Sequence, residues 1–193
     1  PAVVALAALA GYVGFQAMLK ERAIEAGQVH ARTHGLGDVT VNALPQAFSP
    51  FRWMVIIKGT ERYWYAHINV LHHEPPPVSE QASGWLARYS GAFQSIDRAV
   101  WQQVRQFGAD EAEAALSRRI FHEPRFGFYR WFASHPVLYR VERQQGGDCV
   151  WFQDLRFHFP GLDRPTFRYG MCQNGSEWLP VRWAGEGVRK IIE

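Results

Sequence analysis

The first residues of the chain form an almost unbroken apolar run, PAVVALAALAGYVGFQAML, in which Gln16 is the one polar side chain. As a helix this run is about 28 Å long, close to the hydrocarbon thickness of a bilayer. We expect a transmembrane helix whose helical character continues to about residue 34. A buried helix of a soluble domain and a signal-peptide remnant are the alternatives, although no clear basic start or cleavage site is present.

Apolar and polar residues alternate along two runs in the next section of the chain. Residues 51–58 place Phe51, Trp53, Val55 and Ile57 on one face, and residues 62–71 alternate in the same way. Gly59 and Thr60 separate the two runs, so the pattern predicts an antiparallel hairpin. Three prolines from Pro75 then end the strand pattern.

The middle of the chain changes to a helical period. Four apolar residues recur at helical spacing between Asp97 and Gly108, namely Val100, Trp101, Val104 and Phe107. They predict a helix capped by Asp97 and ended by Gly108. A second helix is predicted from Asp110, since acidic residues occupy its first turn and Arg118 and Arg119 its last, as the helix dipole favours.

The C-terminal section returns to strand patterns. Four strands are predicted at residues 137–144, 149–159, 166–173 and 177–183, with Asn174-Gly175 as the clearest hairpin turn. The predicted fold class is α+β: an antiparallel β-meander sheet of about six strands with two inserted helices. We expect this soluble domain to occupy residues 35–193, behind an apolar helix and helical tail at residues 1–34.

Composition narrows the classes of protein. Hydrophobic residues make up 47% of the chain and charged residues 20%, which excludes a disordered chain. The net charge of +3 is dispersed, so we expect no nucleic-acid partner. Positive residues slightly outnumber acidic ones just after the apolar run, which favours a cytoplasmic soluble domain. In that compartment Cys149 and Cys172 are expected to be free and buried, although a bond between neighbouring strands stays open.

Sequence signatures of catalysis are missing, because GxGxxG, GxxxxGK[ST], GxSxG and HExxH do not occur. His30 and His34 are spaced to share a helix face, but they supply only two metal ligands. His72-His73-Glu74 lies on a strand end, where adjacent side chains point to opposite faces. We therefore assign no catalytic residue and no metal ligand. We interpret His30 and His34 as part of a solvated helix end, and His72-His73-Glu74 as part of a polar loop.

Arginine and aspartate residues on the predicted strands are the candidate ligand-binding group. Asp154 and Arg156 share one face of the strand at 149–159, and Arg168 and Arg52 are placed similarly on other strands. Cross-strand ion pairs are the first interpretation of this pattern. The alternative is an anion- or lipid-binding pocket in which arginines bind the ligand beside an aromatic such as Trp53.

Short motifs in this order resemble a known family. They are Pro45-Gln46-Ala47-Phe48-Ser49-Pro50-Phe51-Arg52-Trp53, the aromatic segment 128–136, and Asp154-Leu155-Arg156-Phe157. The chain resembles the C-terminal half of the bacterial inner-membrane metal-dependent hydrolases, also described as LexA-binding hydrolases. The resemblance implies a bacterial inner-membrane location and a divalent metal held in a membrane-embedded N-terminal half, by a His-Arg-x-x-Thr-His-Ser type of motif. His30-Ala31-Arg32-Thr33-His34 departs from that motif, so we carry no metal ligand onto it.

Three functions are compatible with these features. The resemblance, together with the start at Pro1, implies a fragment that serves as the accessory or substrate-presenting domain of a membrane-bound hydrolase. On this reading the chain has no complete catalytic site and no cofactor of its own, and its partners are the membrane and the missing N-terminal half. The alternatives are an anion- or lipid-binding module and a protein-interaction domain of a membrane protein.

Overall fold

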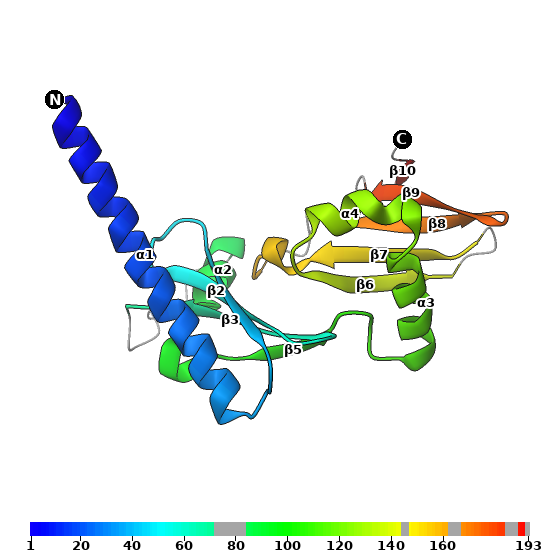
Figure 1. Cartoon of the computed structure of the whole chain (residues 1–193), viewed down its shortest axis with the longest axis horizontal. Coiled ribbons are helices and arrows are strands. Elements are labelled where there is room, and N and C mark those ends of the chain that lie inside the picture. The colour runs from blue at the N-terminus through cyan, green and yellow to red at the C-terminus, as the bar shows by residue number, and fades with distance from the viewer. Residues whose placement is uncertain (72–83, 144–146, 162–166, 184–188, 192–193) are drawn as a thin grey trace. The chain divides into compact units, whose positions relative to one another are not determined.

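The computed structural model describes residues 1–71, 84–143, 147–161, 167–183 and 189–191, and it confirms the α+β class (Figure 1). Its contacts divide the chain into two compact units, Pro1–Gln103 and Val104–Glu193, called unit 1 and unit 2 below. The strands form two five-stranded sheets, where a single sheet of about six strands was expected. Each unit therefore has its own sheet and its own core.

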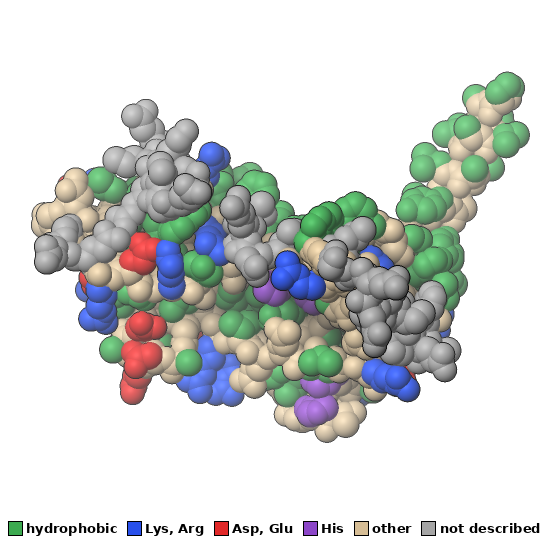
Figure 2. All heavy atoms as spheres, turned by 180° about the vertical axis from the view of Figure 1, so that it is seen from behind, with side chains coloured by type: hydrophobic (Ala, Val, Ile, Leu, Met, Phe, Trp, Pro, Cys, Tyr) green, Lys and Arg blue, Asp and Glu red, His purple; other side chains and the backbone are tan. Residues whose placement is uncertain are grey.

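Unit 1 begins with one continuous helix, α1 (Ala2–Thr33), whose two halves have different surroundings. Every residue as far as Met18 is exposed, apart from the half-buried Gln16. Figure 2 shows this end of α1 projecting with hydrophobic side chains and no charged ones. From Leu19 on, one residue per turn is buried against the sheet: Leu19, Ala23, Gly27 and Ala31. Among the described helices, α1 is the one long and apolar enough to cross a membrane.

Glycines shape both the packing and the end of α1. A Cβ at Gly27 would lie 2.6 Å from Val41 Cγ1 and 2.7 Å from Val55 Cγ1, so only glycine lets the helix approach the sheet this closely. The helix ends at Thr33, and Gly35 follows its cap residue His34 with a φ of 60°, which suits glycine. There Leu36 N–H donates to Ala31 O at 3.0 Å, which satisfies a terminal carbonyl as in a Schellman motif.

The sheet of unit 1 is built around the predicted hairpin, which the structure confirms. Its antiparallel strands are β1 (Thr40–Pro45), β2 (Arg52–Lys58) and β3 (Arg62–Asn69). The short strand β4 (Gln94–Ser95) runs parallel to β3, and β5 (Gln102–Arg105) also pairs with β3. Helix α2 (Trp85–Gly91) and the 3-10 turn η1 (Ile96–Arg98) precede β4 and β5 respectively. Helix α1 packs on the face of the sheet that carries Trp53 and Val55.

The helix predicted between Asp97 and Gly108 is wrong. The chain forms η1 there and then strand β5, which lies along β3. Val100, counted as part of a buried helical stripe, is 66% exposed. Pairing with the open side of β3 satisfies backbone groups over this segment, and this tertiary interaction outweighs a helical spacing of four apolar residues.

Unit 2 contains an antiparallel meander in the order β10-β9-β8-β7-β6. The strands are β6 (Pro136–Glu142), β7 (Cys149–Asp154), β8 (Tyr169–Asn174), β9 (Glu177–Trp183) and β10 (Arg189–Ile191). Before them come α3 (Glu111–Phe121), η2 (Pro124–Phe126) and α4 (Gly127–Phe132). Helix α3 starts where predicted, because the Asp110 carboxylate accepts the Glu113 N–H at 2.9 Å. Aromatic residues of α3, η2 and α4 pack with Phe152 and Tyr169 of the sheet.

Two further expectations for unit 2 are corrected. The strand predicted at 149–159 ends at Asp154, and η3 (Leu155–Phe157) follows it. Cys149 and Cys172 form a disulfide, whereas free thiols were expected. They lie directly opposite each other in the register of β7 and β8, with Cα atoms 4.1 Å apart. The expectation failed because it was derived from a presumed compartment and not from strand register.

Candidate functional site

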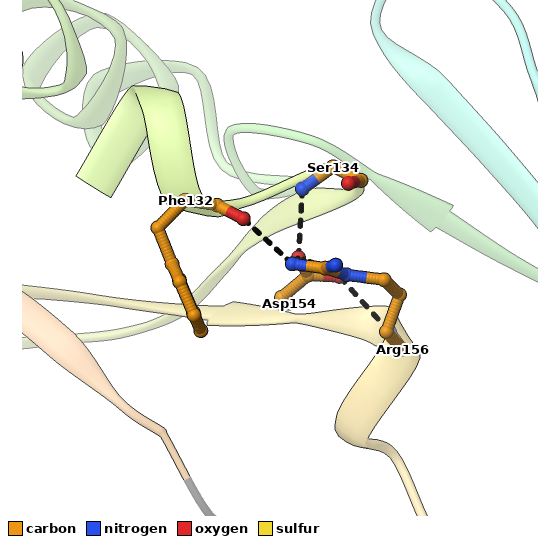
Figure 3. A network of polar contacts seen from close by, with 4 residues as sticks. All are labelled: Phe132, Ser134, Asp154 and Arg156. Atoms are coloured by element: carbon orange, nitrogen blue, oxygen red, sulfur yellow. Dashed lines mark hydrogen bonds and ion pairs between the residues drawn. The ribbon is translucent and has the colours of Figure 1, made fainter. Parts of the chain in front are cut away.

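Asp154 and Arg156 form a polar group with several hydrogen bonds within the described part of unit 2 (Figure 3). Strand β7 ends at Asp154, which is 1% exposed, and η3 places Arg156 two residues later. Asp154 Oδ2 accepts from the Ser134 N–H at 2.8 Å and from Arg156 Nε at 2.8 Å. Its Oδ1 accepts from the Arg156 N–H at 3.0 Å. Both carboxylate oxygens are therefore used inside the protein.

The Arg156 guanidinium is also committed to protein groups. Its Nη2 donates to Phe132 O at 2.6 Å. The same group lies over the rings of Phe132 and Phe157, 5.5 Å and 5.2 Å from their centroids. The pair thus fastens the end of α4 to the end of β7. The pair is local and its carboxylate is buried, so it differs from the expected cross-strand ion pairs, and its donors and acceptors are used within the protein and do not form an open anion pocket.

Arg168 belongs to a different group of side chains in unit 2. Its guanidinium lies 3.6 Å from the centroid of Tyr139 and 5.6 Å from that of Trp183. It is buried, and loss of solvation lowers its pKa from the usual value. The neighbouring Arg140 stacks on Trp183 and pairs with Glu142. Arg168 therefore contributes to packing on Tyr139 and Trp183, while the Asp154 carboxylate is bonded to Arg156 and Ser134.

The other two predicted ligand-binding residues lie in unit 1. Arg52 stands over the rings of Tyr89 and Phe93, at 5.6 Å and 5.2 Å. Trp53 is buried in the core beneath α1, and its Nε1 donates to Pro50 O at 3.1 Å. Of the five predicted residues, the structure brings Asp154 and Arg156 into direct contact. Ligand binding by the set stays a prediction.

An open hollow of about 680 Å³ lies beside the C-terminal half of α1, within unit 1. Helix α1 and its cap residue His34 form one side, to which the helix contributes Arg22, Glu25, Ala26, Val29, His30 and Thr33. The segment around η1 contributes Ile96, Asp97, Ala99 and Trp101. Pockets of this volume hold small ligands in many proteins. The lining carries both signs of charge beside apolar and aromatic surface, so it suits an amphipathic or zwitterionic ligand more than a purely apolar one.

Stacked rings form one wall of the hollow. His30 stacks on Trp101 with centroids 4.1 Å apart, and His34 stacks on the other face of His30 at 4.0 Å. His34 Nδ1 is 2.9 Å from His30 O, so backbone contact also fixes the outer ring. Parallel rings do not aim their nitrogen atoms at a common point, which disfavours a shared metal ion. The described residues contain no cluster of three or more metal-ligating side chains, and His72-His73-Glu74 lies outside them.

Sequence reasoning missed this hollow. Arg22, Glu25, Val29 and Thr33 recur at helical spacing, so the face of α1 was readable from the sequence. The opposite wall could not be predicted from the sequence, because Asp97 and Trp101 had been assigned to a helix. No family model, no curated protein and no solved structure matches this chain. The class that the structure defines is an α+β protein with an N-terminal helix able to span a membrane.

Proposed function

We propose that this chain is a membrane-attached accessory domain that presents a substrate or partner at the bilayer surface to a membrane-embedded metal-dependent hydrolase. The proposal rests on the different surroundings of the two halves of α1. Its exposed apolar half suits lipid, and its second half, starting at Leu19, packs on the sheet of unit 1. Arg22, the first residue of α1 to line the hollow, comes one turn after the apolar segment ends. One rigid helix would therefore hold the hollow close to the membrane.

The hydrolase part of the proposal rests on the sequence resemblance, and the accessory role has a direct test. The purified chain in detergent is assayed for bound metal by mass spectrometry and for hydrolysis of nitrophenyl phosphate and nitrophenyl ester substrates. We expect no stoichiometric metal and no turnover, because catalysis is assigned to the membrane-embedded half. A purified chain that retains one metal ion per molecule and hydrolyses either substrate would contradict the accessory role.

Membrane attachment is tested separately by a charge in the apolar half of α1. Leu9 is exposed and lies within the proposed span. An arginine near the bilayer centre costs about 2.5–3.5 kcal/mol by insertion scales. Leu9→Arg should therefore move the chain from the carbonate-resistant membrane fraction towards the soluble one, and Leu9→Phe should not. Equal retention of both variants would speak against a spanning helix.

A second candidate function is a binding module for an anionic or lipid-like ligand, and the hollow favours it. Arg22 supplies a positive charge, His30 and His34 supply ring nitrogens for hydrogen bonding, and Val29 and Trp101 supply apolar surface. Arg22→Gln should weaken binding of a short-chain anionic phospholipid in a calorimetric titration. A matched substitution of the exposed Arg119, which does not line the hollow, should leave the affinity unchanged.

We further propose that the folded units lie on the oxidising, extracytoplasmic side of a bacterial inner membrane. Disulfides persist in the periplasm and are rare in the cytosol. The Cys149–Cys172 bond uses both cysteines of the chain. The slight excess of positive charge after the apolar run favours the cytoplasmic side instead. The disulfide is the stronger argument because the charge bias is small.

A further inference from the structure

Unit 1 exposes aromatic rings close to the point where α1 meets the sheet. We call these rings the aromatic belt: Phe15, Phe48, Phe51 and Trp85, which lie beside the buried ring of Tyr89. Phe48 packs against Trp85 and Tyr89, with centroids 6.1 Å and 5.8 Å apart. Phe51, on the same β1–β2 loop as Phe48, meets Phe15 of α1 edge-on at 5.9 Å. Phe48 is 73% exposed, Trp85 45% and Phe15 37%. These rings remain on the surface although a buried core lies beside them.

The loop that carries Phe48 is held firmly in place. Gln46 N–H donates to Arg52 O at 2.9 Å and closes the loop at its base. The Tyr89 hydroxyl donates to Ala47 O at 3.1 Å, and the Trp53 indole donates to Pro50 O at 3.1 Å. Phe48 has a φ of 67°, in the left-handed region that L side chains rarely adopt. The surrounding bonds therefore hold a strained residue in a position that turns its ring outward.

The aromatic belt is continuous with the apolar surface of α1. Phe15 lies one turn before Leu19, the first buried residue of the helix. The Phe15–Phe51 contact joins that surface to the β1–β2 loop, which lies beside the middle of α1 in Figure 1. Aromatic side chains with a polar group, such as Trp and Tyr, favour the boundary between lipid and water. Arg52, stacked on Tyr89, adds a positive charge that suits phospholipid phosphate.

We propose that the β1–β2 loop and the start of α2 dock into the interfacial layer of the same bilayer that α1 spans. This inference rests on the proposed membrane attachment of α1. Phe48 and Trp85 enter the headgroup region, and Arg52 lies near the phosphates. The contact gives unit 1 a second attachment point, which restrains its rotation about α1 and fixes which side of the unit faces lipid.

The native disulfide makes a single-cysteine labelling experiment possible. Both native cysteines are bonded, so an added cysteine is the free thiol available for labelling without reductant. Phe48→Cys is labelled with a polarity-sensitive fluorophore in the full chain, reconstituted in phosphatidylethanolamine–phosphatidylglycerol nanodiscs. Val4→Cys reports insertion of α1. Val100→Cys is the matched water-exposed control, because Val100 is also apolar, exposed and in unit 1.

Headgroup-attached nitroxide lipid should quench the label at position 48 about twofold or more above the label at position 100, since an interfacial residue lies at headgroup depth. Acyl-chain nitroxide should quench the label at position 4. If position 48 behaves as position 100 while position 4 is quenched, the docking proposal is wrong and the attachment of α1 stands. If position 4 is also unquenched, the attachment of α1 is wrong and the docking proposal is overturned with it.

Two further variants test whether the result at position 48 reflects misfolding. A quenching comparison then tests whether a protein, and not the bilayer, covers the loop. Trp85→Cys leaves the loop unchanged and should give the same lipid quenching as Phe48→Cys. Phe48→Gly removes the ring at a position whose φ suits glycine, and it should reduce quenching of the label at position 85. A label at position 48 shielded from both iodide and nitroxide lipid would indicate a protein contact, and it would overturn docking on the bilayer.

Discussion

The Asp154–Arg156 pair and the hollow beside α1 contain the same kinds of residue in opposite situations. Each combines arginine, carboxylate and aromatic side chains. In the pair, the carboxylate bonds to Arg156 and to a backbone N–H, and the guanidinium bonds to a backbone carbonyl. In the hollow, Arg22 and Glu25 are exposed around an open volume.

The difference lies in the hydrogen-bonding capacity that remains for a ligand. A buried charge costs free energy unless protein groups satisfy it, so a buried pair that is well satisfied is explained by folding alone. Exposed charges around a hollow keep water as their partner, and a ligand can replace that water. Residue type and spacing suggested the pair first as an ion pair and, in the alternative, as part of a ligand-binding set, whereas the hollow was not predicted.

The largest expected effect is the loss of the Asp154 charge. Asp154→Asn removes the ion pair with Arg156 and weakens the bond from Ser134, which should lower the free energy of unfolding by about 3 kcal/mol. Chemical denaturation in detergent measures this loss. Arg125→Gln is the control, because its pair with Glu177 is exposed at 3.1 Å and such pairs contribute less than about 1 kcal/mol. Equal effects of the two substitutions would remove the structural role assigned to Asp154.

Loss of the disulfide should have a similar effect. The bond links residues 23 apart in the sequence, for which loop-closure entropy predicts a stabilisation of about 3 kcal/mol. Replacing Cys149 and Cys172 together by serine should lower stability by that amount. Reductant should do the same to the wild type and should have no further effect on the double variant. Free thiols detected by alkylation of the protein in whole cells would contradict the proposed oxidising compartment.

Local patterns were sufficient to predict much of the fold. The apolar run predicted α1, alternation predicted the β2–β3 hairpin, and Asn174-Gly175 predicted the β8–β9 turn, where Gly175 has a φ of 61°. Long-range pairing was not predictable in the same way. Strand β5 forms because β3 has an open side, and no local property of residues 102–105 predicts that they pair with β3.

The candidate sites show the same limit. Asp154 and Arg156 are two residues apart, so their proximity could be predicted, although η3 and not a longer strand brings them together. Arg168 was expected near them from its position on the next strand, yet it lies on Tyr139 and Trp183. The hollow depends on Trp101 reaching His30 across many residues of sequence. Its discovery required the tertiary structure.

Disturbing the packing of α1 on the sheet should give the next largest loss of stability. This change tests whether the wall of the hollow that α1 forms depends on close packing. Gly27→Ala places a Cβ 2.6 Å from Val41 Cγ1, and overpacking of this kind costs about 1–3 kcal/mol. Gly11→Ala is the matched control, because nothing lies within 4 Å of the added Cβ. Thermal unfolding should show a lower Tm for Gly27→Ala and no decrease for Gly11→Ala. A similar Tm for both variants would contradict the tight contact between α1 and the sheet of unit 1.

Acid should destabilise unit 2 through His158 by a smaller amount. Burial lowers the pKa of His158 below its usual 6.5, so the folded state disfavours the charged imidazole. The contribution of His158 to the free energy of unfolding is therefore fully present above pH 6.5. It falls as the pH drops towards the folded-state pKa, by at most about 1.4 kcal/mol per pH unit. His158→Gln should flatten this part of the pH profile of unfolding. The exposed His122→Gln serves as control, and an unchanged slope in His158→Gln would contradict the assignment.

The smallest effect on stability is expected in the hollow, and it tests the comparison most directly. Arg22 is exposed on α1, and substitutions at such positions usually change stability by no more than about 0.5 kcal/mol. Arg22→Gln should therefore unfold with the wild-type denaturation midpoint while it weakens binding of the anionic phospholipid. A loss of stability as large as that of Asp154→Asn would mean that the hollow is held together by its own charges. The two regions would then be structural networks of one kind, and the hollow would have no free capacity for a ligand.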